Sequence, residues 1–247
     1  MKRLLSLVAL LALHSGARAV EYPEPTGPAA VQTMPGATIG QLLFESGRNF
    51  YSGSGTVIRP SSVLTAAHNL WDADQGFSTD IAFRRGQYGA RALAEHYPSR
   101  IYVLSGYREN ARRHSGESVR AFSFDLGALV FRSAVANGAS LGWWANPALL
   151  QPRVPTVAFG YGGEYHTGDD LLSVATRSGY GRIFGGFYES DAVYFEAGMS
   201  GGPVVSTAAD GKRYVTGVVV ASSSEPASGG IRALDATAAS FIRRFMK

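Results

Sequence analysis

The amino-acid sequence predicts an all-β protein, an antiparallel sandwich or barrel, closed by a C-terminal helix. Short segments rich in β-branched and aromatic residues alternate with glycine, proline, serine and asparagine, which is typical of antiparallel sheets. The only strong helical pattern comes last, where Asp235 can cap a segment that has Phe241 and Ile242 on one face. The predicted strands are residues 50–58, 62–65, 101–104, 124–131, 154–159, 192–195 and 214–221.

Length and composition restrict the chemistry available to the chain. Its 247 residues, 45% of them hydrophobic and 17% charged, fit one large β domain or two small ones with a sizeable core. The chain has no cysteine, so it has no thiolate metal site, no iron–sulfur cluster and no cysteine nucleophile. No motif for a nucleotide or for a zinc-binding helix occurs, and we expect neither a metal nor an organic cofactor. The side chains of Asp72, Asp74, Asp169 and Asp170 could supply oxygen ligands for calcium, or they could simply belong to solvated loops.

Residues 1–19 have the pattern of a secretory signal peptide. Lys2 and Arg3 precede an apolar stretch at residues 4–13, and Ala-Arg-Ala at residues 17–19 is a cleavage signature. The stretch is about half the roughly 20 residues that a membrane helix needs, so we expect a soluble, secreted or periplasmic mature protein, of bacterial type and monomeric. Without this segment the chain has 20 basic and 19 acidic side chains, and the pI of 9.4 does not indicate a nucleic-acid partner. The proline-containing residues 20–40 are either an N-terminal arm or a propeptide.

Gly-Met-Ser-Gly-Gly-Pro at residues 198–203 is the first pattern with possible chemistry. A serine hydroxyl becomes a good nucleophile only when a base takes its proton, and the resulting oxyanion needs N–H donors. The glycines around Ser200 allow a tight turn in which the Gly198 and Ser200 N–H groups point into one small space. The alternative is a glycine-rich hairpin with an incidental serine.

Two further patterns supply a histidine and a carboxylate. An apolar strand ends in Thr-Ala-Ala-His at residues 65–68, and His68 suits the role of a base because its ordinary pKa lies near neutrality. Asp125 stands at the start of an apolar run, where a carboxylate is disfavoured unless it is paired. Taken alone, His68 is better explained as a surface or capping residue, and Asp125 as a turn or edge residue exposed to water. We expect His96, His114 and His166 to be loop residues.

Together the three patterns resemble the chymotrypsin-like serine peptidases, and within them the bacterial glutamyl endopeptidase branch. The resemblance implies two antiparallel six-stranded β-barrels packed together, at about residues 41–135 and 150–233, with the helix at 235–246 completing a peptidase domain over 41–247. It also implies a nucleophile at Ser200, a general base at His68, an orienting carboxylate at Asp125 and an oxyanion hole at Gly198 and Ser200. Every histidine precedes Ser200, which excludes the order of an α/β-hydrolase.

Departures from the family pattern concern activation and specificity. Met199 stands where trypsin-type members place an aspartate that pairs with a new amino terminus, so we do not expect activation by that ion pair. Val219 stands where glutamyl endopeptidases have a histidine that binds an acidic substrate side chain, so we do not expect acidic specificity. Tyr194 stands where trypsin-type enzymes have an aspartate that binds a basic side chain, although Asp191 or Glu196 could enter the pocket instead.

The predicted pocket consists of Tyr194, Val219, Val220 and Ser222. It favours small or apolar side chains of a protein or peptide substrate. The family resemblance therefore predicts a secreted serine endopeptidase. The alternative is an inactive homologue that uses the old cleft to bind a ligand.

Overall fold

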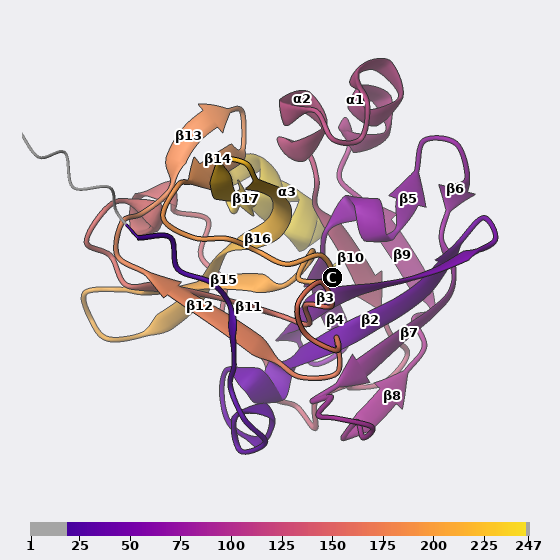
Figure 1. Cartoon of the computed structure of the whole chain (residues 1–247). Coiled ribbons are helices and arrows are strands. Elements are labelled where there is room, and N and C mark those ends of the chain that lie inside the picture. The colour runs from indigo at the N-terminus through magenta and orange to yellow at the C-terminus, as the bar shows by residue number, and fades with distance from the viewer. Residues whose placement is uncertain (1–18, 246–247) are drawn as a thin grey trace, which may run out of the picture.

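The computed structural model describes residues 19–245, and two curled antiparallel sheets make up most of the fold (Figure 1). The all-β prediction is confirmed, and the two sheets have seven and eight strands, where the family resemblance implies barrels of six. The predicted signal peptide, except Ala19, lies outside the described residues. Within residues 19–245, no helix is long and apolar enough to cross a membrane.

The first sheet has the strand order β8-β7-β2-β3-β4-β10-β9. Its interior is filled by apolar side chains such as Leu42, Val57, Phe83 and Leu129, all of them inaccessible to water. The strands are β2 (Ile39–Ser46), β3 (Asn49–Arg59), β4 (Ser62–Thr65), β7 (Thr79–Arg85), β8 (Ala94–His96), β9 (Arg100–Val103) and β10 (Gly127–Val130).

The second sheet has the order β1-β12-β11-β15-β16-β17-β14-β13. Its interior contains Phe195, Met199, Val204 and Ile231. The strands are β1 (Glu24–Pro25), β11 (Thr156–Gly160), β12 (Leu172–Thr176), β13 (Gly181–Phe184), β14 (Phe187–Ser190), β15 (Pro203–Thr207), β16 (Arg213–Ser224) and β17 (Ala227–Ala233). A separate ribbon pairs β5 (Trp71–Asp72) with β6 (Gly76–Phe77).

A shared apolar core joins the two sheets to the C-terminal helix α3 (Ala236–Phe245). Leu64 from β4, Val218 from β16 and Ile242 from α3 are all fully buried in it. Burying a side chain of this size stabilises the fold by roughly 1.5–3 kcal/mol, so this interface holds the sheets in one relative orientation. The remaining helices are α1 (Tyr107–His114), α2 (Val119–Phe122) and the short 3-10 turns η1 (Ala30–Gln32), η2 (Gly36–Thr38), η3 (Ala67–Asn69) and η4 (Pro147–Leu150).

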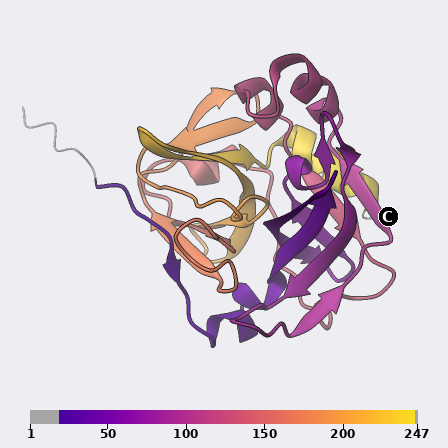
Figure 2. The ribbon, with the colours of Figure 1, turned by 45° about the vertical axis from the view of Figure 1, so that its right-hand side comes forward.

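The N-terminal arm lies along the outside of the second sheet, where Figures 1 and 2 show it in indigo beside the orange strands. Glu21 donates its N–H to Ala192 O (2.9 Å) and accepts the Tyr194 N–H (3.0 Å) through its carbonyl. Strand β1 then pairs with β12. The arm is therefore an edge strand of the second sheet and is bonded to the segment that leads toward Ser200.

This contact corrects one prediction. Residues 192–195 were expected to form a strand, but only Val193 makes an isolated bridge, with Glu21. Strand β14 ends at Ser190, whose hydroxyl accepts the Ala192 N–H, and the chain turns away from the sheet. Two of the three histidines expected in loops are also elsewhere, because His96 ends β8 and His114 ends α1.

Helix α3 provides a test of the fold. Asp235 Oδ1 accepts the Ala238 N–H (2.9 Å) and a hydrogen bond from Arg232 (3.1 Å), whose side chain is only 1% exposed. Replacement by alanine removes a helix cap and the carboxylate facing a buried guanidinium, so Asp235→Ala should cost about 2–4 kcal/mol in urea unfolding. Asp235→Asn keeps an acceptor oxygen and should cost less. A loss below about 0.5 kcal/mol for Asp235→Ala would contradict this account.

Candidate active site

His68 lies on η3, directly after strand β4. The strand ends at Thr65, and the fully buried Ala66 and Ala67 let the chain turn tightly below the cleft. Helices α1 and α2 cover this turn through an apolar cluster that includes Trp71 and Tyr107. The position of the histidine is therefore determined by packing on both sides.

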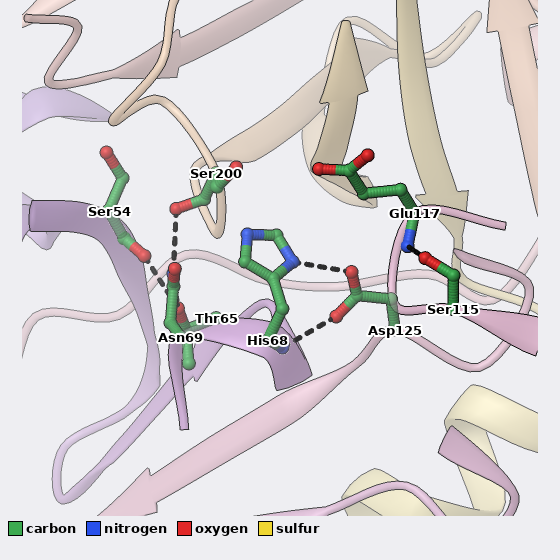
Figure 3. A network of polar contacts seen from close by, with 8 residues as sticks. All are labelled: Ser54, Thr65, His68, Asn69, Ser115, Glu117, Asp125 and Ser200. Atoms are coloured by element: carbon green, nitrogen blue, oxygen red, sulfur yellow. Dashed lines mark hydrogen bonds and ion pairs between the residues drawn. The ribbon is translucent and has the colours of Figure 1, made fainter. Parts of the chain in front are cut away.

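Asp125 occupies the turn between α2 and β10 and is completely buried. A buried carboxylate needs partners, and His68 supplies two of them. Asp125 Oδ1 accepts the His68 backbone N–H (3.0 Å), and Oδ2 lies 2.6 Å from His68 Nδ1 (Figure 3). This pairing assigns the ring proton to Nδ1 and leaves Nε2 as the proton acceptor.

The charge of His68 follows from the same contact. Burial lowers the pKa of the imidazole, but the charge of Asp125 and its hydrogen bond raise it by more, so the pKa lies above 6.5. Protonated His68 therefore stabilises the fold below about pH 6.5, and this contribution is lost as the pH rises through the raised pKa.

Ser200 faces His68 from the second sheet. Its carbonyl oxygen accepts the Ser54 N–H (2.7 Å) and the Asn69 side-chain amide (2.9 Å), and Asn69 is the residue after His68. Figure 3 shows Ser200 beside the imidazole, on the far side of the ring from Asp125. Among the described residues the Ser200 hydroxyl has no hydrogen bond to His68, a separation that is common before substrate binds.

The peptide units before Ser200 leave two N–H groups without a partner. Gly198 has a φ of 96°, which favours glycine, and its carbonyl accepts the Ser54 hydroxyl (2.9 Å). The Met199 N–H donates to Glu196 O and the Gly201 N–H to Val219 O. Within residues 19–245 the Gly198 and Ser200 N–H groups have no acceptor, and both residues line the cleft.

The cleft has a volume of about 1510 Å³ and lies between the two sheets. His68 and Trp71 line its first-sheet side, and Gly198, Ser200 and Val220 line the other. A cleft of this size and position accommodates several residues of an extended peptide.

The four predicted pocket residues are not all at this surface. Val220 and Ser222 line the cleft, whereas Tyr194 and Val219 are buried and do not line it. The Tyr194 hydroxyl donates to Glu164 Oε2 (2.6 Å), and burial followed by this hydrogen bond raises the pKa of Tyr194.

Neither acidic residue that the sequence suggests for basic specificity lines the cleft. Asp191 and Glu196 are absent from the residues lining it. The Glu196 carboxylate is bonded instead to His166, with Glu196 Oε1 2.6 Å from His166 Nδ1.

The sequence allows Asp72, Asp74, Asp169 and Asp170 to be either calcium ligands or residues of solvated loops. Asp72 Oδ1 accepts the N–H groups of Asp74 and Gln75, and Asp170 Oδ1 accepts the Gly89 N–H. No group of three or more histidine, aspartate or glutamate side chains in the described chain is arranged to hold a metal ion.

Several residues of the site were not found from the sequence. Ser54 and Asn69 connect the Ser200 loop to the first sheet, yet both are distant from it along the chain. In the sequence, the one sign of a role for Asn69 is that this polar residue directly follows His68. His166 and Glu196 also belong to the surroundings of the site, and their pairing has no local signature.

Two curled antiparallel sheets with a cleft between them define the chymotrypsin-fold serine peptidases as a class. The chain belongs to the trypsin family, whose family model matches residues 30–242. A solved Glu endopeptidase is similar with a TM-score of 0.70 and 18% identity, over 93% of this chain and 97% of the other. The protease Anisep from Arthrobacter nicotinovorans is similar with a TM-score of 0.65 and 17% identity, over 82% and 92%. At these identities the similarity establishes the fold alone.

A curated relative adds a different observation. The inactive CLIP domain-containing serine protease A3 of Aedes aegypti is 27% identical over 176 residues, which are 64% of this chain. The chain spans 35% of the length of that relative. Similarity to the family therefore does not by itself establish catalytic activity.

The paired His68 and Asp125 give a direct test of the site. In NMR titration the His68 ring should titrate above pH 6.5, and Asp125→Asn should move its pKa downward because the carboxylate charge is lost. Glu95→Gln, in a surface ion pair with Arg84, is the matched control and should leave His68 unchanged. Titration of native His68 at or below pH 6.5 would contradict the prediction that the effect of Asp125 on its pKa outweighs the effect of burial.

Proposed function

We propose that the protein is an exported serine endopeptidase that hydrolyses peptide bonds through an acyl-enzyme. Ser200 is the nucleophile, His68 the general base and acid, and Asp125 the group that orients the imidazole. The observation that carries this proposal is the pair of hydrogen bonds that Asp125 accepts from His68 at one edge of the cleft, with the carbonyl of Ser200 accepting a third from Asn69, the residue after His68. Export rests on the signal-peptide pattern of residues 1–19.

The first half of the reaction forms the acyl-enzyme. Ser200 Oγ attacks the carbonyl carbon of the scissile bond while His68 Nε2 takes the hydroxyl proton. The negative charge that develops on the carbonyl oxygen is stabilised by the unpaired Gly198 and Ser200 N–H groups. The C–N bond then breaks, and His68 returns the proton to the leaving amine.

The second half releases the product. Water gives a proton to His68 and attacks the ester carbonyl, and the ester bond to Ser200 breaks as the proton passes back to Oγ. Only the neutral imidazole can accept a proton in each half, so hydrolysis becomes faster as the pH rises through the raised pKa of His68.

Activation by a new amino terminus is not part of this proposal. The Met199 side chain is fully buried in the core of the second sheet and cannot form an ion pair. The arm at residues 20–40 carries β1 and bonds to residues 192–194, which favours an arm that stays with the mature enzyme.

The nucleophile is tested with a fluorophosphonate probe, which modifies only an activated serine. The purified native protein should be labelled, and Ser200→Ala should lose labelling and about 10⁶-fold in kcat. Thr207→Ala, at the end of β15 in the same sheet, is a control that leaves the site intact.

A native protein that is folded but not labelled would favour the second candidate, an inactive homologue that binds a ligand in the same cleft. The observation in favour of this second candidate is that the Aedes aegypti relative is named an inactive serine protease. Retained binding of an uncleaved peptide, unaffected by Ser200→Ala, would then support that candidate.

The cleft wall beside Ser200 predicts the specificity. Ala197, Val220, Ala221 and Ser222 are small or apolar and none carries a charge. In a peptide library, substrates with a small or apolar side chain before the scissile bond should therefore be cleaved at least about tenfold faster than substrates with a charged side chain there. Cleavage only after glutamate, aspartate, lysine or arginine would contradict this pocket.

A further inference from the structure

A second histidine–carboxylate pair lies beside the Ser200 loop. Glu196 Oε1 is 2.6 Å from His166 Nδ1, and Glu196 Oε2 accepts the Tyr165 N–H (3.2 Å). The Glu196 side chain is 1% exposed and that of His166 is 28% exposed. Both carboxylate oxygens therefore bind the loop that follows β11, and neither is free to bind a basic substrate.

Backbone contacts connect the same two segments. The Gly163 N–H donates to Ala197 O (2.8 Å). The Ser54 hydroxyl accepts the Tyr161 N–H (2.8 Å) and donates to Gly198 O (2.9 Å), so one side chain joins both segments to β3. Residues 161–166 thus form the support on which residues 196–198 rest.

The support packs closely against Glu196 at Gly162. A Cβ atom at Gly162 would lie 2.7 Å from Glu196 Cβ and 2.7 Å from its Oε2, so only glycine allows the carboxylate to approach this loop. Glu196 O in turn accepts the Met199 N–H (3.0 Å), closing the turn that contains Gly198. The orientation of the Gly198 peptide thus depends on where Glu196 is held.

We infer that His166 and Glu196 are a positioning pair that fixes the Gly198 N–H in the direction of the reacting carbonyl oxygen. The inference rests on the proposed function. Because the buried Met199 offers no charge to anchor this turn, the anchoring charge is supplied by Glu196, three residues earlier. Neither residue of the pair touches the substrate, and both act through the Gly198 peptide.

Glu196→Gln, His166→Gln and His166→Ala test this role. A displaced oxyanion donor weakens binding of the transition state more than that of the substrate. Glu196→Gln should therefore lower kcat about 10-fold to 100-fold and change KM less than about threefold. The rate of fluorophosphonate labelling should fall in parallel, since the phosphoryl oxygen enters the same hole.

Comparison of the two His166 variants separates positioning from general destabilisation. Glutamine can still donate a hydrogen bond to Glu196, so His166→Gln should keep more of the native kcat than His166→Ala. The control is Glu95→Gln, which breaks a surface ion pair with Arg84, neither residue of which lines the cleft, and it should leave kcat and labelling unchanged. If Glu196→Gln does not fold, the comparison of the His166 variants decides.

Three results would overturn the inference. One is a native kcat in folded Glu196→Gln, and the second is a rise in KM alone, which would place the pair in substrate binding. The third is equal loss in both His166 variants. Failure of the proposed function looks different, because the native protein itself would then remain unlabelled, and this inference would fall with it.

Discussion

The contact that connects the two sheets at the Ser200 carbonyl is the constraint on which the site depends. This oxygen accepts one hydrogen bond from the backbone of Ser54, on β3 of the first sheet, and one from the side chain of Asn69, on η3 just after β4. Ser200 lies in the loop that leads into β15 of the second sheet, so the distance between its hydroxyl and the His68 imidazole depends on how the sheets dock. The docking is maintained by the apolar core of Leu64, Val218 and Ile242. A core substitution far from the cleft can therefore change the distance between the Ser200 hydroxyl and the His68 ring through this one carbonyl.

Buried carboxylates recur wherever a loop of the site has to be held. Asp125 binds the backbone and ring of His68, and Glu196 binds the backbone of Tyr165 and the ring of His166. In both cases an imidazole that is partly exposed covers a carboxylate that is almost completely buried. Removing water from such a carboxylate makes its hydrogen bonds directional and costly to break. The chain has no cysteine, so its loops are held without disulfides, by contacts of this kind, backbone hydrogen bonds and apolar packing.

Much of the fold could be predicted from the sequence because alternating apolar residues and turn residues are local signals. Strands β3, β4, β16 and the capped helix α3 followed from them. Residues 192–195 show the limit of that reasoning, since their apolar side chains are buried without joining a sheet. Helix α1 was missed because only Tyr107 and Ala111 face the core, too few for a clear period.

The candidate site divides in the same way. Ser200, His68 and Asp125 stand in short motifs with a family resemblance, so they could be named before any coordinates. The role of Ser54 and the pairing of Glu196 with His166 could not, because a hydrogen bond between distant segments leaves no trace in local composition. The burial of Tyr194 was equally unpredictable, since its hydroxyl is directed by Glu164 on another loop.

The path of the arm has a practical consequence. Glu21 is hydrogen-bonded to both Ala192 and Tyr194, and the ring of Tyr22 lies 5.5 Å from that of Tyr194. A purification tag or fusion partner joined ahead of Val20 has to leave the surface next to this segment, where its bulk competes with the edge pairing. Attachment beyond α3 avoids that conflict, and immobilisation of the protein on a support is best done from that end.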